Sequence, residues 1–292
     1  MKRARKENLI KRLFCLFSLF SIVFLLGIVI VLFKEGLPIF KVTSFGKFFF
    51  GKFWYPTYEP PDFGILPLLL GSLWVTAGAL IIAVPLGVAS AVYISEVAHP
   101  KIKGLIKPAI ELLAGVPSVV YGFFGMVVVA PLVQKFFGLP VGLNALTASI
   151  LLGVMAIPTI TSISEDAISS VPKSFKEASY ALGANRWETT VKVTVPSAAG
   201  GISTAIILGM GRAIGETMTV LMVAGGAAVI PRSFFQPVRT MTATIAAEMG
   251  ETVVGSEHFH ALFAIALVLF VLTLSLNIGA DVLTQKFRKR LR

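Results

Sequence analysis

Two ionisable residues lie midway along a long apolar stretch, in the run GMGRAIGETM from Gly209 to Met218. If the stretch is one helix, Arg212 and Glu216 are i and i+4, so they share a face and lie within pairing distance. A charge inside a membrane is costly unless it is paired or hydrated, which makes such a residue a functional-site hypothesis. Arginine is a planar donor fork that is always charged, so Arg212 suits a tetrahedral oxyanion.

The residue types leave two roles open for this pair. In one, Glu216 neutralises Arg212 while a transport path is empty, and an entering anion competes for the guanidinium. In the other, a permanent Arg212–Glu216 ion pair holds neighbouring helices in register. Hydroxyls that could line the same path belong to Thr217, Ser118, Tyr121 and Thr159, although Ser and Thr more often bond the backbone of their own helix.

The composition places these residues in an integral membrane protein. Of the 292 residues, 55% are hydrophobic and 14% charged, and the mean hydropathy is +0.84, far from the values of soluble domains. A spanning helix needs about 20 apolar residues. We therefore predict an all-α protein with six transmembrane helices, at about 13–33, 66–94, 109–133, 144–163, 201–224 and 260–282.

The distribution of Lys and Arg predicts the orientation, because positively charged loops resist translocation. Segments 1–12, 95–108, 164–200 and 283–292 hold 18 of them, and the alternate segments hold 7. Both termini and loop 164–200 are therefore predicted to be cytoplasmic. The net charge of +11 follows from this bias and from anionic lipid, so no nucleic-acid partner is expected. His258 and His260 have too few companions for a metal site.

Loop 164–200 carries signals for short helices. Ser174-x-x-Glu177 is a capping-box pattern directly after Pro172, and Gly183 can supply the left-handed residue that ends the helix. Phe175, Ala178 and Leu182 would form its apolar face. Asn185-x-x-Glu188 offers a second cap, although the β-branched run Thr189–Val195 favours strand by propensity. An amphipathic connector lying on the membrane surface is the alternative reading.

The same loop resembles a motif of the permease subunits of ABC importers. It reads E-A-S-x3-G-x9-V-x-V-P from Glu177 to Pro196, and the family loop reads E-A-A-x3-G-x9-I-x-L-P. In that family a paired-helix element sits in a cleft of the ATPase. The resemblance assigns this role to Ser174, Glu177, Ala178, Ser179, Leu182, Gly183 and Pro196.

Further segments resemble phosphate permeases of the PstC type. They are 211–218, 63–67, 115–125 and 243–251, and the resemblance covers nearly all of residues 60–280. PstA-type subunits usually have Ala-Pro after the Gly-Glu-Thr, whereas this chain has Met218-Thr219, which favours the PstC side.

The resemblance implies a type I ABC importer permease fold over residues 61–292. Residues 1–60 would hold an N-terminal tail, the first spanning helix and an outer loop. The implied partners are a PstA-type permease subunit, an ATPase dimer and an external phosphate-binding protein, in the cytoplasmic membrane of a prokaryote. ATP and magnesium would bind the partner ATPase, so this chain needs no cofactor and is not an enzyme.

Two other functions remain open at this point. The same fold could import sulfate, molybdate or tungstate, since an Arg fork alone does not distinguish tetrahedral oxyanions. An ion-coupled secondary transporter is a different class, but such proteins are commonly built from repeats, and no internal repeat is evident here.

Overall fold

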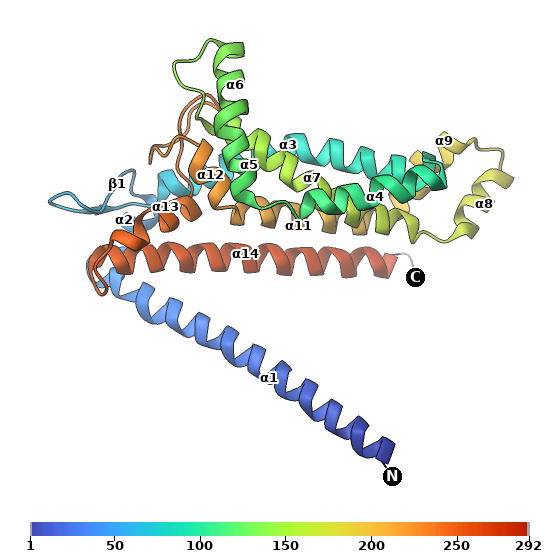
Figure 1. Ribbon diagram of the computed structural model, residues 1–292, viewed down its shortest axis with the longest axis horizontal. Helices are drawn as coiled ribbons and strands as arrows, with labels where there is room; N and C mark the ends of the chain where they lie inside the picture. The colour runs from blue at the N-terminus through green and yellow to red at the C-terminus, as the bar shows by residue number, and fades with distance from the viewer. Residues whose placement is uncertain (1, 291–292) are drawn as a thin grey trace.

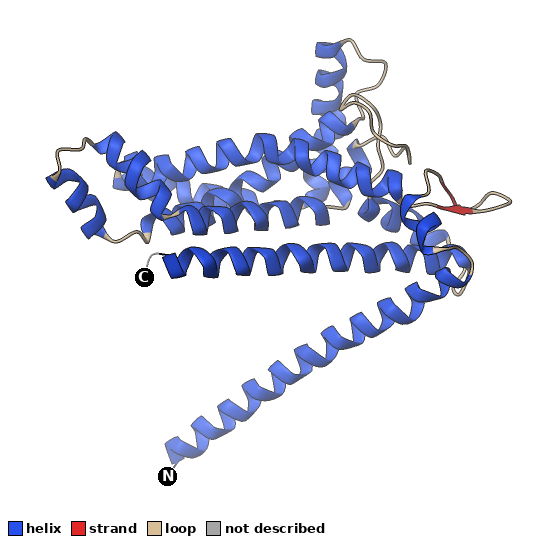
Figure 2. Cartoon of the chain, turned by 180° about the vertical axis from the view of Figure 1, so that it is seen from behind, coloured by secondary structure: helices blue, strands red, loops and turns tan. Residues whose placement is uncertain are grey.

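The computed structural model describes the backbone of residues 2–290 and the side chains of residues 10–282 and 285. The described chain is mostly helical (Figure 2). Five helices are long: α1 (Lys2–Gly36), α3 (Leu66–Val92), α7 (Ala145–Ser169), α11 (Ala199–Gly215) and α14 (Glu257–Arg290). The basic side chains of residues 2–6 and 286–292, which support the predicted orientation, lie outside the described side chains.

Shorter elements connect the long helices. They are η1 (Leu37–Lys41), α2 (Phe45–Phe50), η2 (Tyr93–Val97), α4 (Pro100–Ala114), α5 (Ser118–Phe124), η3 (Gly125–Val129), α6 (Ala130–Phe137), α8 (Lys173–Ala181), α9 (Arg186–Thr189), η4 (Thr190–Thr194), α10 (Val195–Ser197), α12 (Met218–Val223), α13 (Met241–Glu248) and η5 (Met249–Glu251). A small antiparallel ribbon pairs β1 (Trp54–Tyr55) with β2 (Asp62–Phe63).

The centre of the molecule is a bundle in which α3, α7, α11 and α14 run along one axis (Figure 1). Small residues let these helices approach closely. A Cβ at Gly87 of α3 would lie 2.8 Å from Ile160 Cγ2, and one at Gly209 of α11 would lie 2.7 Å from Ile160 Cγ1. The Ile160 side chain of α7 therefore fills the space that two glycines leave, which joins α3, α7 and α11.

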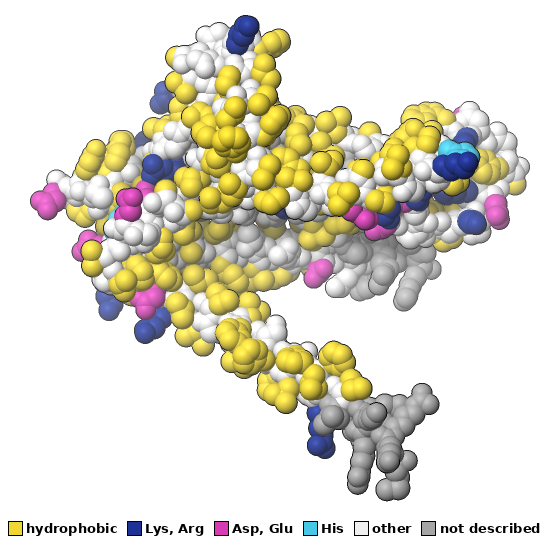
Figure 3. Space-filling view, viewed as in Figure 1, with side chains coloured by type: hydrophobic (Ala, Val, Ile, Leu, Met, Phe, Trp, Pro, Cys, Tyr) yellow, Lys and Arg dark blue, Asp and Glu magenta, His cyan; other side chains and the backbone are white. Residues whose placement is uncertain are grey.

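Apolar side chains cover the outside of α1 and of the arm formed by α5, η3 and α6 (Figure 3). Within the described part of the chain, five helices are long and apolar enough to cross a membrane: Ile10–Lys41, Leu66–Val97, Ser118–Phe137, Ala145–Ser169 and Glu257–Val282. A sixth candidate is bent by 66° between Arg186–Ser197 and Ala199–Gly215. So much exposed apolar surface is unfavourable in water but is compatible with contact to lipid.

The predicted continuous helix over 109–133 is wrong, because the chain breaks between α4 and α5. Helix α4 ends at Ala114, Gly115 is its C-cap, and Pro117 takes an extended conformation before α5. Proline has no amide hydrogen and disfavours helix in the preceding residue, so the GVP sequence ends one helix and starts another. Helix α4 then lies along α7, whereas α5 and α6 rise away from the bundle axis (Figure 1).

The predicted continuous helix over 201–224 is also wrong. Helix α11 ends at Gly215, Glu216 is extended with ψ of 129°, and α12 begins at Met218. The break is stabilised by α13, since Thr242 Oγ1 donates a 2.8 Å hydrogen bond to the Glu216 carbonyl oxygen. A tertiary contact thus replaces a helical hydrogen bond at this point.

Helices α8 and α9 lie at one end of the bundle, together with the last turns of α14 and the first turns of α1 (Figure 1). The start of α1, the end of α14 and the hairpin thus lie toward one end of the bundle, while the orientation in the membrane stays a prediction. The opposite end carries the ribbon, α2 and α13. We refer to these as the α8 end and the α13 end.

Close backbone packing in α3 generates a stability prediction. A Cβ at Gly71 would lie 2.5 Å from the Arg239 carbonyl oxygen, so Gly71→Ala forces helix and loop apart. Overpacking of this kind costs about 1–3 kcal/mol, and we expect a lower melting temperature in detergent. Gly27→Ala is the matched control, because no atom lies within 4 Å of its added Cβ. Equal melting temperatures for the two variants would contradict the packing described here.

Candidate functional site

Arg212 lies half-buried in the last turn of α11, where it contacts the end of α4 and the interior of α7. Its Nη1 donates to Thr159 Oγ1 of α7 at 3.2 Å, and its Nη2 donates to the carbonyl oxygen of Ala114 at 3.1 Å. Ala114 is the last residue of α4, and the final carbonyls of a helix have no partner within the helix. The guanidinium therefore takes one acceptor from the helix end and one from a side chain.

Glu216 is not the partner of Arg212, which corrects the expectation of an i, i+4 ion pair. Because the helix ends at Gly215, Glu216 leaves the helical face that Arg212 occupies. Its Oε1 instead accepts a hydrogen bond from the Thr219 backbone amide at 3.2 Å, in the first turn of α12. Among the described residues, no carboxylate lies within salt-bridge distance of Arg212.

The predicted hydroxyl residues separate into two groups. Thr159 contacts Arg212 directly, and the Tyr121 hydroxyl donates to the Leu113 carbonyl oxygen at 3.1 Å, one residue from the Arg212 acceptor. Thr217 Oγ1 bonds only the nearby Gly215 carbonyl oxygen, at 3.3 Å. The backbone carbonyl of Ser118 accepts from Thr219 Oγ1 at 2.9 Å. Arg212, Thr159 and Tyr121 thus converge on the end of α4, while Ser118 and Thr217 support the helix breaks.

The loop between α7 and α11 forms a helical hairpin with an open groove of about 610 Å³. Leu182 at its edge is 89% exposed, and Phe175 and Ala178 also line it. The hairpin is closed from within by a 2.9 Å hydrogen bond between the Ser179 and Thr189 hydroxyls, which are buried. An exposed apolar groove is a surface suited to a protein partner.

The capping predictions for this hairpin have mixed outcomes. The Ser174–Glu177 capping box is not formed, because α8 begins two residues earlier, with Pro172 as its N-cap. The second box is present: Asn185 Oδ1 accepts from the Glu188 amide at 2.8 Å, and Glu188 Oε2 accepts from the Asn185 amide at 3.0 Å. This contact to the Asn185 amide lowers the pKa of the Glu188 carboxyl.

Other hairpin predictions can be compared with the observed backbone. Gly183 has φ of +84°, the left-handed conformation expected at a helix end. The β-branched run after Thr189 is helical, mostly as a π-type turn, and Pro196 lies in α10 just before the 66° bend into α11. Glu177 is exposed.

A charged cluster near the α8 end was missed by the sequence analysis. Glu165 of α7, only 2% exposed, binds Lys103 at 2.6 Å and Lys107 at 2.7 Å, both from α4. Lys107 also binds Asp166 at 2.7 Å. The Asp166 and Glu165 carboxylates raise the pKa of Lys107 above its ordinary value, so this lysine stays charged. The sequence signal that could have predicted this cluster is the pair of adjacent carboxylates at 165–166 together with two lysines four residues apart, Lys103 and Lys107.

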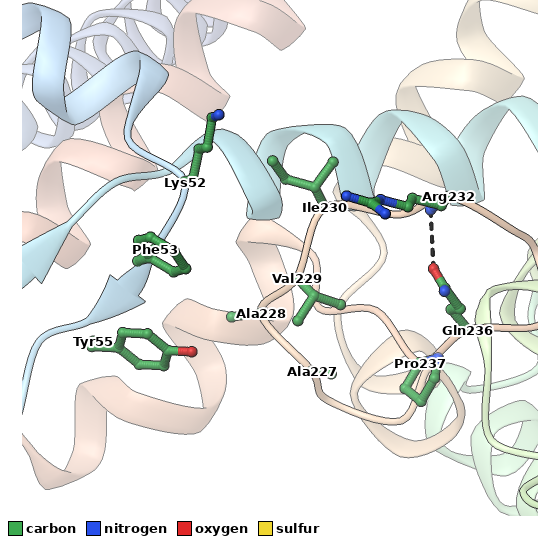
Figure 4. A pocket seen from close by; sticks show the side chains of 10 residues that line it. All are labelled: Lys52, Phe53, Tyr55, Ala227, Ala228, Val229, Ile230, Arg232, Gln236 and Pro237. Carbon is green, nitrogen blue, oxygen red and sulfur yellow. Dashed lines mark hydrogen bonds between the residues drawn. The ribbon is translucent and has the colours of Figure 1, made fainter.

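The α13 end has a hollow of about 550 Å³ between two segments far apart in the sequence (Figure 4). Its lining comes from residues 52–55 and 227–237, and it includes Lys52, Arg232 and Gln236. The Gln236 side-chain oxygen accepts from the Arg232 backbone amide at 3.0 Å. Arg212 is not part of this hollow, so the hollow and the half-buried guanidinium are separate features.

The arrangement matches a known transporter fold. A bacterial alginate ABC transporter, solved with an alginate-pentasaccharide-bound periplasmic protein, contains a chain with a TM-score of 0.67 and 14% identity, over 98% of this chain and 96% of that one. The fold is that of type I ABC importer permeases, the membrane-spanning subunits that do not hydrolyse ATP. More specifically, the chain belongs to the binding-protein-dependent transport system inner membrane component family, which matches residues 83–289.

Relatives place the chain more narrowly within the family. It is 44% identical to the "Probable ABC transporter permease protein YqgH" of Bacillus subtilis, over 85% of this chain and 81% of that protein. It is 34% identical to the "Phosphate transport system permease protein PstC" of Haemophilus influenzae, over 97% and 94% of the two chains. The chain is therefore a multi-pass membrane protein and the permease subunit of an ABC importer.

The capping box at Asn185 predicts local stability of the hairpin. Asn185→Ala removes the acceptor for the Glu188 amide, and loss of such a cap costs about 0.5–2 kcal/mol. We expect several-fold faster amide hydrogen exchange over residues 186–190, measured in detergent. Lys192→Ala is the control, because its 3.7 Å contact with Glu188 is exposed. Unchanged exchange in Asn185→Ala would show that the cap does not stabilise α9.

Proposed function

We propose that this chain is the PstC-type subunit of a phosphate importer, with Arg212 as the residue that meets the anion. The observation that carries the proposal is a guanidinium inside an apolar bundle whose acceptors are one carbonyl and one hydroxyl. Both acceptors are neutral, so an entering oxyanion offers Arg212 a stronger, charge-assisted partner. An ion pair with Glu216 would have opposed this exchange.

Neighbouring groups support the same role. When the anion takes the guanidinium, Thr159 Oγ1 is left free to donate to an anion oxygen, and Tyr121 lies beside the same helix end. Glu216 then acts on the backbone of α12 rather than as a counter-ion. Phosphate would cross without chemical change, because these groups would only bind and release it.

The proposed partners follow from the groove and from the family. An ATPase dimer would dock on the α8–α9 hairpin through Leu182, Phe175 and Ala178. ATP and magnesium would bind to that ATPase rather than to this chain. A PstA-type subunit would complete the transport path. An external phosphate-binding protein would deliver the anion at the α13 end.

The proposed location is the cytoplasmic membrane of a prokaryote, with the α8 end inside the cell. The excess of Lys and Arg in the segments at that end supports this orientation. The terminal segments and the hairpin lie at the same end of the bundle, as this orientation requires (Figure 1).

Removal of the guanidinium tests the anion role. In the full complex reconstituted in vesicles, we expect Arg212→Ala to lower the affinity for transported phosphate at least about tenfold, because charged hydrogen bonds contribute about 1.5–3 kcal/mol. Arg212→Lys should recover only part of the loss, since it lacks the fork. Uptake of radiolabelled phosphate measures the affinity of both variants. Competition with sulfate, molybdate and tungstate identifies the preferred anion.

The control for this experiment is Lys135→Ala, an exposed cation on α6. It tests whether loss of any positive charge changes uptake. Wild-type rate and affinity in Arg212→Ala would mean that Arg212 only braces helices. Preferential inhibition by sulfate would keep the transport role and change the substrate.

The hairpin groove predicts where the ATPase binds. Leu182→Asp places a charge on an apolar side chain that is 89% exposed, and a partner that buries it would have to desolvate the carboxylate. We expect co-purification of the ATPase to fall sharply. Val253→Asp is the matched control, because Val253 is 76% exposed in the segment between α13 and α14. Full retention of the ATPase by Leu182→Asp would show that docking does not use this groove.

A further inference from the structure

Helix α4 lies along α7, and none of its residues is buried. Around its middle, Lys103 and Lys107 bind the Glu165 carboxylate, and at its last residue the Ala114 carbonyl accepts from Arg212. The Gly115–Pro117 break separates α4 from α5, although the Tyr121 hydroxyl of α5 still donates to the Leu113 carbonyl oxygen. Helix α4 thus connects a charged cluster to the proposed anion site.

The same charged cluster continues to the α8–α9 hairpin. Ser169 Oγ donates to Glu165 Oε1 at 2.6 Å, and the Ser95 hydroxyl of η2 lies 3.1 Å from Ser169 Oγ. Ser95 also lies 3.3 Å from Glu96 Oε1. Because Ser169 already donates its proton to Glu165, the single proton of Ser95 can go either to Ser169 or to Glu96.

The hairpin is bound to this cluster by two cations. Lys176 of α8 pairs with Glu96 Oε1 at 2.6 Å, and the Arg186 guanidinium of α9 donates to the Glu96 backbone carbonyl. Both contacts join residues that are 80 or more positions apart in the sequence. A contiguous set of polar contacts thus runs from the hairpin through Glu96, Ser95, Ser169 and Glu165 to α4.

We propose that Glu165 is a positioning residue that couples the ATPase-binding hairpin to Arg212 through α4. A displacement of the hairpin pulls on Glu96, changes the contact between η2 and α7, and shifts the lysines that hold α4. Movement of α4 then carries the Ala114 carbonyl away from Arg212 and frees the guanidinium for the anion. The inference rests on the proposed function, because it assumes that the hairpin meets an ATPase and that Arg212 meets substrate.

Glu165 is the central member because its carboxylate holds both lysines while nearly enclosed by protein. A buried charge that loses its partners is strongly destabilising, so Lys103 and Lys107 follow Glu165 rather than separate from it. The two lysine side chains are 36% and 33% exposed. They can be hydrated when Glu165 is neutralised, so Glu165→Gln removes the link without leaving a buried unpaired charge.

The test uses the full reconstituted complex and compares Glu165→Gln with Asp166→Asn. Asp166 also binds Lys107, but it is 65% exposed and leaves the Glu165 contacts intact. We expect Glu165→Gln to assemble with its partners and to hydrolyse ATP without substrate at a rate within about twofold of wild type. Its stimulation by the phosphate-loaded binding protein, and its phosphate uptake per ATP, should fall about tenfold or more. Asp166→Asn should retain both.

A second measurement does not depend on the stability of Glu165→Gln. The background is Cys15→Ser, which removes the one natural cysteine, and an environment-sensitive fluorophore is attached at Leu112→Cys, a position that is 75% exposed near the end of α4. We expect the emission to change when a non-hydrolysable ATP analogue is added to the complex.

The outcomes separate the inference from the proposed function. Stimulation and uptake per ATP at wild-type levels in Glu165→Gln, or emission at Leu112→Cys that does not respond to the ATP analogue, would overturn the role of Glu165 and α4 while leaving the importer intact. Absence of any ATP-driven uptake by the wild-type complex would overturn the proposed function, and the inference with it.

Discussion

A guanidinium inside an apolar helix bundle has to find acceptors, and this requirement shapes the centre of the molecule. Arg212 obtains them from Thr159 and from the Ala114 carbonyl, which is available only because α4 ends there. A continuous helix would have used that carbonyl internally. The break at Gly115–Pro117 is therefore part of the site. The break after Gly215 has the complementary effect, because it takes Glu216 away from the cation.

The two breaks also divide the bundle into separate helical parts. Helices α3, α7 and α11 are joined by glycine contacts around Ile160, where a small displacement meets steric resistance. Helix α4 has no buried residue, and polar contacts join it to the bundle through the lysines on Glu165 and through its last carbonyl. The structure thus combines a close-packed core with one more exposed helix beside the proposed anion site.

The sequence was sufficient for the class of protein and for the position of the hairpin, because both depend on local signals. Apolar length identified the spanning segments, and Gly183 and the Asn185 box define turns within a few residues. The helix breaks were not predicted, because the length of an apolar stretch does not indicate where a helix within it ends. At Pro117 a local signal was present, but at Glu216 the break depends on Thr242, a tertiary partner from α13. The Glu165 cluster joins residues about 60 positions apart, which hydropathy and loop charge counts do not relate.

A structure of the assembled complex with phosphate trapped in the membrane would test the central claim most directly. The account predicts phosphate oxygens within hydrogen-bond distance of the Arg212 guanidinium, and an Ala114 carbonyl that has moved out of that distance. Phosphate bound elsewhere in the bundle, with the bond between Arg212 and Ala114 intact, would contradict it.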